Sequence, residues 1–118
     1  MDYFRVLIAL LVITLYGCSD RSYAPPGISV SQSKQYVPQD TDLALIYNRS
    51  CRSCHTVAAT GSPLTGDTAA WAPRMDKGMT VLLDNVVNGY GGMPPLGLCM
   101  DCDADQFEAL IHFMAAPE

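Results

Sequence analysis

The stretch Cys51-Arg52-Ser53-Cys54-His55 decides how this chain of 118 residues is interpreted. Two thiols three positions apart, at the end of a helix, can reach the two vinyl-derived carbons of one haem. The histidine that follows directly then lies under the iron and supplies an imidazole nitrogen. The motif therefore predicts one covalently attached haem c, with Cys51 and Cys54 as the attachment points and His55 as an iron ligand.

Other uses of paired cysteines fit the sequence less well. A thioredoxin-like redox pair belongs in a βαβ setting, and no strand pattern surrounds this one. A zinc site could combine the motif with the second pair, Cys99 and Cys102, but the two pairs lie far apart compared with common zinc ribbons. The second pair has no histidine after it, so a second haem is not expected there.

The N-terminal residues 1–17 have the features of a bacterial signal peptide. Arg5 precedes an apolar run of eleven residues, which is too short for a bilayer span of about 20. The run ends in Leu15-Tyr16-Gly17-Cys18, which resembles the lipobox of lipoproteins and implies a lipid on Cys18. An ordinary signal peptide, or a short uncleaved anchor, is the alternative. We expect the protein on the periplasmic side, anchored to the outer membrane because Ser19 follows the cysteine, with the inner membrane as the other possibility.

Composition divides the rest of the chain into a linker and one domain. Residues 18–39 carry Ser, Pro, Gly, Gln and Tyr without helical periodicity, which predicts a flexible tether. Residues 40–118 form the predicted domain. The net charge of −5 and the lack of a Lys/Arg cluster argue against a nucleic-acid partner.

Hydrophobic periodicity predicts an all-α domain, because apolar residues recur at helical spacing and no alternating strand pattern appears. The first helix should start at Asp40 or Thr41, and at 100° per residue its inner face reaches both cysteines of the haem motif. The other helices are predicted at residues 67–76, 79–88 and 103–115. The inward side chains expected on the last two are Met79, Leu82, Leu83, Val86 and Val87, then Phe107, Leu110, Ile111 and Met114.

A second iron ligand is predicted at Met93. It lies in Gly91-Gly92-Met93-Pro94-Pro95, where the glycines allow close approach of the backbone to a flat ring and the prolines restrict the loop. Met100, His112 or an open iron position are the alternatives that the residues leave.

From Leu43 onward the chain resembles a class I cytochrome c, and specifically the cytochrome c5 group. The resemblance covers about two thirds of the chain and implies a small monohaem fold of about four helices. The residues that carry it are Tyr47-x-x-x-Cys51-x-x-Cys54-His55, Gly61-Ser62-Pro63, Ala70-Trp71-Ala72-Pro73-Arg74, Lys77-Gly78-Met79, Asn88-Gly89, Met93-Pro94-Pro95 and Cys99-Met100-Asp101-Cys102.

The resemblance also assigns roles to residues around the haem. It implies His55 and Met93 as axial ligands, with the carbonyl of Pro63 bonded to the other ring nitrogen of His55. It further implies a disulfide between Cys99 and Cys102, for which a redox-active dithiol is the alternative. Leu96 departs from the pattern, because a lysine or another polar residue is expected after the two prolines, and this changes the charge at the haem rim.

Trp71 and Arg74 have two interpretations. Both could donate hydrogen bonds to the haem propionates, or Trp71 could be core packing and Arg74 a solvated charge.

The predicted function is one-electron transfer between redox proteins, with no small-molecule substrate. No nucleophile with a base and no pair of carboxylates points to an enzyme. Two alternatives remain, a cytochrome subunit fixed in a larger oxidoreductase complex and a haem-based gas sensor.

Overall fold

The computed structural model describes residues 27–118. The predicted signal peptide, the lipidation residue Cys18 and the first part of the predicted tether therefore lie outside the described residues. Within residues 27–118 no helix is both long enough and apolar enough to cross a membrane.

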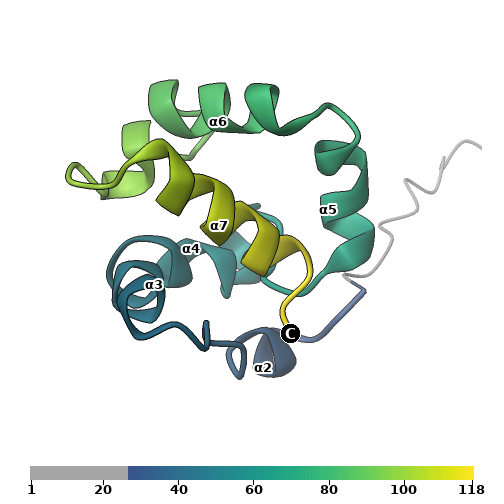
Figure 1. The fold of residues 1–118 in the computed structure, drawn as a ribbon. Helices are drawn as coiled ribbons and strands as arrows, with labels where there is room; N and C mark the ends of the chain where they lie inside the picture. Colours follow the sequence, from purple (N-terminus) through teal and green to yellow (C-terminus); the bar gives the residue numbers. More distant parts are fainter. Residues whose placement is uncertain (1–26) are drawn as a thin grey trace, which may run out of the picture.

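The described chain is helical, which confirms the all-α prediction (Figure 1). The C-terminal helix α7 lies at the centre and contacts α3, α5 and α6. The helical segments are α2 (Val30–Ser33), α3 (Thr41–Ile46), η2 (Tyr47–Cys51), α4 (Arg52–His55), η3 (Ala58–Thr60), α5 (Thr68–Met75), α6 (Met79–Asn88), η4 (Pro95–Leu98) and α7 (Ala104–Ala115).

Aspartates define where three of the helices begin. The side chains of Asp40, Asp67 and Asp103 accept hydrogen bonds from backbone N–H groups in the first turns of α3, α5 and α7. Those N–H groups have no partner inside a helix, so an N-cap oxygen satisfies them. Gln106 completes a capping box with Asp103. The predicted first helix starts where α3 does, and the helices predicted at residues 67–76, 79–88 and 103–115 start and end within a few residues of α5, α6 and α7.

The helix that carries the haem motif is not regular. The segment η2 is a π-helix that joins α3 to α4, and the three segments follow one another without a break. The prediction that 100° per residue continues through the motif is therefore wrong over η2. Short π segments of this kind are often found at functional sites, and this one ends at Cys51.

The core lies between α7 and the other helices. Phe107, Leu110, Ile111 and Met114 of α7 are all buried, as the periodicity predicts. The buried apolar face of α6 is narrower than predicted, because Val87, which was predicted to point inward, is 48% exposed. Leu82 and Val86 are the residues of α6 that are fully buried.

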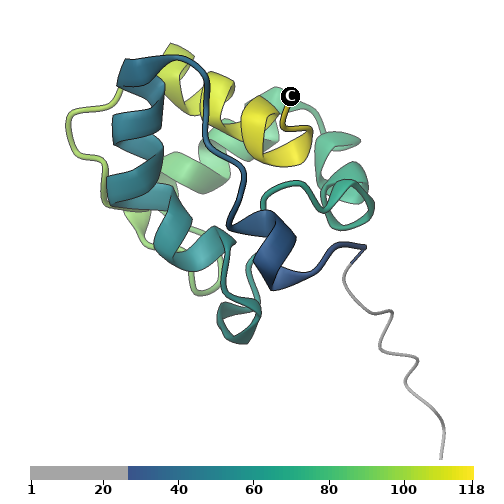
Figure 2. The ribbon, with the colours of Figure 1, turned by 90° about the horizontal axis from the view of Figure 1, so that it is seen from below.

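The predicted tether is wrong for residues 27–39, because they are part of the folded unit. α2 lies beside the end of α4, as Figure 2 shows, and its last residue, Ser33, is completely buried. The amide of Gly27 donates a hydrogen bond of 3.1 Å to the buried carboxylate of Asp67. Composition alone missed this segment because its turns and its two isolated buried residues, Ser33 and Pro38, leave no apolar periodicity.

Candidate functional site

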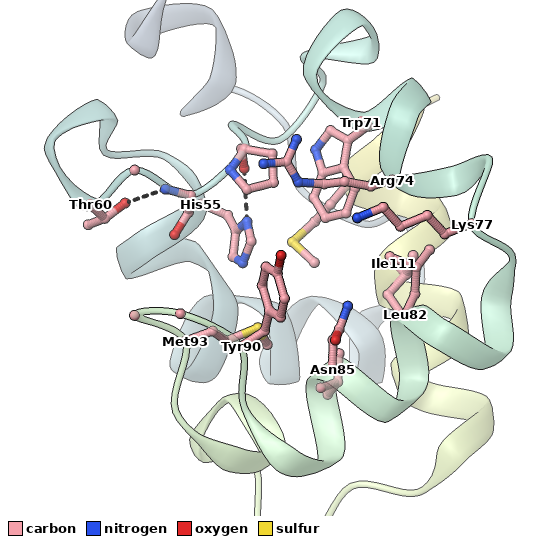
Figure 3. A pocket seen from close by; sticks show the side chains of 17 residues that line it. His55, Thr60, Trp71, Arg74, Lys77, Leu82, Asn85, Tyr90, Met93 and Ile111 are labelled. Atoms are coloured by element: carbon pink, nitrogen blue, oxygen red, sulfur yellow. Dashed lines mark hydrogen bonds between the residues drawn. The ribbon is translucent and has the colours of Figure 1, made fainter.

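A cavity of about 270 Å³ lies between the loop after α4, the end of α5, the inner face of α6 and the loop before η4. Figure 3 shows His55 on one wall and Met93 on another, with side chains of α5, α6 and α7 completing the surface. The residues that line it are His55, Thr60, Gly61, Ser62, Pro63, Trp71, Arg74, Lys77, Leu82, Asn85, Val86, Tyr90, Gly91, Gly92, Met93, Ile111 and Met114. The lining brings together two predicted iron ligands that are far apart in sequence.

The imidazole of His55 is oriented for binding a metal. Its Nδ1 lies 2.8 Å from the carbonyl oxygen of Pro63, which only accepts hydrogen bonds, so Nδ1 carries the proton. Nε2 is then left with a free lone pair, and Figure 3 shows this nitrogen turned to the cavity. Burial lowers the pKa of His55, and the charge of Arg74 lowers it too, while the bond to Pro63 acts in the opposite direction. The ring is thus held neutral, which is the form that binds iron.

The loop around Met93 is tightly constrained. Its N–H and carbonyl form two backbone hydrogen bonds with Tyr90, of 3.0 and 3.1 Å. A Cβ on Gly89 would lie 2.8 Å from the carbonyl oxygen of Met93, and one on Gly97 would lie 3.3 Å from its Cε. Both glycines have positive φ, so larger residues there would be strained as well as crowded. The sulfur of Met93 is therefore held at the cavity wall.

Neither alternative second ligand lies at this cavity. Met100 is 76% exposed, and His112 has a side chain 58% exposed that pairs with Glu108 on the surface of α7. The structure thus places Met93, and neither of these two residues, at the cavity that His55 lines.

Cys51 and Cys54 are half-buried on the segment that precedes His55, at the end of η2 and within α4. Burial, helped by the neighbouring Cys54, raises the pKa of Cys51 to about 11. This cysteine is therefore a protonated thiol at neutral pH. Formation of a thioether adds the sulfur and the hydrogen of such a thiol across a vinyl double bond, so the residues present fit covalent haem attachment.

The structure separates the roles of Trp71 and Arg74. Trp71 is buried, stacks on the ring of His55 with centroids 5.7 Å apart, and donates its indole N–H to the carbonyl of Leu64 at 2.9 Å. Its donor is already used, so the interpretation of Trp71 as core packing fits and the propionate role does not. The guanidinium of Arg74 also bonds the carbonyl of Ala70, but it lines the cavity.

Sequence reasoning missed several polar residues of the cavity, among them Lys77 and Asn85. Lys77 follows α5 and extends to the cavity beside Arg74, while Asn85 of α6 reaches the cavity near Tyr90 (Figure 3). Among residues 27–118, no carboxylate lies within 4.0 Å of either Arg74 or Lys77. Two cations without an acidic partner therefore face one side of an otherwise largely apolar cavity. Asn85 stands next to Asp84 between apolar positions of α6, so the sequence did not distinguish the side chain that reaches the cavity from its exposed neighbour.

The second cysteine pair forms a disulfide in the structure, between Cys99 and Cys102. Arg49 of η2 reaches this turn, and one guanidinium nitrogen lies 3.1 Å from the sulfur of Cys99 and 2.7 Å from a carboxylate oxygen of Asp101. The hydrogen bond from Arg49 holds the pKa of Asp101 below its ordinary value. The turn before α7 is thereby linked to the segment that carries the haem motif.

Comparison with known proteins agrees with this arrangement. A family model described as cytochrome c oxidase, cbb3-type, subunit III, matches residues 38–114. Cytochrome c5 of Ectopseudomonas mendocina is 38% identical over 72 residues, which are 59% of this chain and 83% of that protein. Cytochrome c5 of Azotobacter vinelandii is 39% identical over 67 residues, 55% of this chain and 81% of that protein.

The chain belongs to the class I c-type cytochromes, in the cytochrome c5 group. A solved structure of the electron-transfer complex of nitrite reductase with cytochrome c has the same fold, with a TM-score of 0.56 and 33% identity over 64% of this chain and 93% of the other. This cytochrome therefore carries haem c, bound covalently at the Cys-x-x-Cys-His motif, and acts as an electron carrier.

Proposed function

We propose that this cytochrome carries single electrons between redox proteins on the periplasmic side of a bacterial membrane, with His55 and Met93 as the axial ligands of its haem. The observation that carries the proposal is the placement of His55 and Met93 on the walls of one cavity. The bound haem supplies a one-electron Fe(III)/Fe(II) couple, and ligation by histidine and methionine favours a relatively high potential.

The chain's own residues fix the positions of both iron ligands, so that the iron can change oxidation state with little rearrangement of the protein. The bond to Pro63 fixes the ring of His55, and the backbone bonds to Tyr90 fix the loop of Met93. We assign Arg74 and Lys77 to the two haem propionates, since both cations face the cavity without an acidic partner in the described chain. Asn85 supplies a further donor at the same side.

The same two ligands support a carrier that is not an enzyme by itself. With both axial positions filled by protein, no iron position is left for a substrate. The related cytochrome in the solved complex is bound to nitrite reductase, and a redox protein is the kind of partner that we assign to this chain. A gas sensor would need to release Met93 readily. Binding of carbon monoxide to the reduced protein at neutral pH would favour the sensor, and its absence would remove that alternative.

The family description gives the second candidate, a cytochrome subunit fixed in an oxidase complex. Purification from native membranes separates the two candidates. A mobile carrier is released from the membranes by itself when detergent is added or when its lipid anchor is removed. It also exchanges electrons with an added partner. A fixed subunit co-purifies in constant ratio with the other subunits of an oxidoreductase.

We also propose a lipid on Cys18 and attachment to the outer membrane facing the periplasm, with the inner membrane as the alternative. Support comes from the sequence Leu15-Tyr16-Gly17-Cys18-Ser19. Because the folded unit includes residue 27, only residues 19–26 separate the lipid from the domain. A chain of that length reaches at most about 30 Å even when fully extended, so the domain would stay close to the membrane surface.

The anchor is tested with a Cys18→Ser variant and washed membranes. We expect the wild-type cytochrome in the membrane fraction with added acyl mass, and the variant either soluble or retaining its signal segment. Wild-type protein that is wholly soluble and starts after residue 18 without acyl mass would contradict the anchor, and it would leave the electron carrier intact.

A further inference from the structure

We propose that residues 27–36 form a strap that positions the backbone of the iron ligand His55, with Ser33 as the positioning residue. This strap lies N-terminal to the family match, which covers residues 38–114. The inference rests on the proposed role of His55 as an axial ligand. It gives this chain an element of the haem-binding unit that the family match does not include.

The inner contact of the strap is with His55 itself. Ser33, the last residue of α2, is completely buried and donates its hydroxyl to the backbone carbonyl of His55 at 3.3 Å. The same carbonyl accepts the N–H of Thr65 at 2.7 Å. His55 is the last residue of α4, so its carbonyl has no partner inside the helix. Two donors from outside, one of them in the strap, therefore fix the backbone that carries the ligand.

A second contact binds the strap to the haem motif from the outside. Arg52, between the two motif cysteines, donates one guanidinium nitrogen to the carbonyl of Lys34, directly after Ser33. Its other terminal nitrogen donates to Asn48 at 2.9 Å, which orients the guanidinium. Two neighbouring strap residues, Ser33 and Lys34, thus contact two residues of the motif, His55 and Arg52.

The ends of the strap are held at two further points. At one end the N–H of Gly27 bonds the buried carboxylate of Asp67, and a Cβ on Gly27 would lie 2.9 Å from an oxygen of that carboxylate. At the other end the ring of Tyr36 packs on Gly66, where a Cβ would lie 2.5 Å from the ring. Asp67 and Gly66 are neighbours in the loop that also provides Thr65. The strap therefore ties α4, which ends at His55, to the loop after Pro63, whose Thr65 donates to the same carbonyl of His55.

The test measures local opening at His55 in the complete holoprotein. In the reduced state the proton on Nδ1 of His55 can be followed by NMR while it exchanges with deuterium. A hydrogen bond of this kind contributes about 0.5–1.5 kcal/mol, so in Ser33→Ala we expect this proton to exchange roughly two- to tenfold faster. Tyr36→Ala, which loosens the strap without touching His55, is expected to act in the same direction.

Two comparisons separate positioning from general destabilisation. The amide of Ile111, in the buried centre of α7, reports on global opening and is expected to exchange at an unchanged or much less accelerated rate. Ser31→Ala, an exposed serine of the same helix α2, is the matched control and should leave His55 unaffected.

Three results would count against the proposals. Equal acceleration of exchange at His55 and Ile111 in Ser33→Ala would show that the strap contributes only to global stability, and it would overturn the positioning role. Unchanged exchange at His55 in Ser33→Ala would overturn that role too. A His55 ring without the large ring-current shifts of a haem ligand would instead refute the ligand assignment, which distinguishes failure of the proposed function from failure of the strap.

Discussion

The hydroxyl of Tyr47 lies 2.9 Å from Oγ1 of Thr65, and both side chains are completely buried. Tyr47 begins the π-helical segment η2, and Thr65 also donates its backbone N–H to the carbonyl of His55. A chain of hydrogen bonds therefore runs from the helix that carries the haem motif, through the loop after Pro63, to the ligand itself.

Removal of the Tyr47 hydroxyl is expected to destabilise the cytochrome. In Tyr47→Phe the buried hydroxyl of Thr65 loses its partner, which costs about 1–3 kcal/mol. Guanidinium unfolding of the holoprotein measures the change in the free energy of unfolding.

The double variant Tyr47→Phe/Thr65→Val removes both partners and should recover a large part of that loss, because no unpaired hydroxyl remains. Thr80→Val is the control for loss of a threonine hydroxyl, since Thr80 is exposed on α6, and it should change little. Additive losses in the double variant would show that the two hydroxyls do not interact.

The ionisation of Tyr47 predicts how the free energy of unfolding changes with pH in the alkaline range. Burial is the main cause that raises the pKa of Tyr47 above its ordinary value, so the neutral phenol is favoured in the folded state. The stabilising contribution of the neutral Tyr47 phenol is complete below the pKa of about 10 that tyrosine has in the unfolded chain. It is lost as the pH rises through the higher pKa of Tyr47 in the folded protein. We expect the stability difference between wild type and Tyr47→Phe to shrink above about pH 10. A difference independent of pH would contradict this assignment.

Much of the fold could be predicted from local patterns. The helices around Leu82 and Leu110 follow a 3.6-residue period and begin at aspartate or glycine caps, so their bounds were visible in the sequence. The π turn before Cys51 was not visible, because periodicity assumes a constant rotation per residue. The strap was missed because Ser33 is held by a hydrogen bond to the distant His55, and such a contact leaves no apolar pattern.

The residues of the candidate site likewise divide into those that the sequence predicts and those that only the structure shows. His55 and Met93 were predicted because motif and loop composition mark them directly, and the structure brings both to one cavity. The hydrogen bond from Trp71 to Leu64 depends on tertiary packing, so the sequence could not decide between its two interpretations. Lys77 was missed for the related reason that an isolated lysine is usually a solvated charge.

Met93→Ala tests the second axial ligand. We expect the haem to stay covalently attached, the potential to fall, and the weak far-red band expected of methionine-ligated ferric haem to disappear. The loss of the thioether also opens the iron to added ligands such as imidazole. Met100→Ala, at the exposed turn, is the matched control and should keep the band. Loss of the band in the control and its retention in Met93→Ala would move the ligand to Met100.

Lys77→Gln tests the cations at the cavity. Removal of a positive charge near the haem favours the ferric state, so the potential should fall. One charge at about 10 Å contributes roughly 0.4 kcal/mol in water and more where it is less solvated, which corresponds to on the order of 20 mV for one electron. Arg74→Gln, at a half-buried position, should lower the potential further than Lys77→Gln. Lys34→Gln, in the strap, is a control that should leave the potential nearly unchanged, and equal shifts in all three would argue against a propionate role.

The central claim is that the bound haem makes this chain a one-electron carrier with both axial positions filled by protein. An equilibrium redox titration of the purified wild-type holoprotein, followed by the haem absorbance with and without carbon monoxide, tests it most directly. We predict a single reversible transition with the slope of one electron per chain and the same midpoint in both titrations. A midpoint that carbon monoxide raises, or a transition that is irreversible or takes more than one electron per chain, would contradict the account.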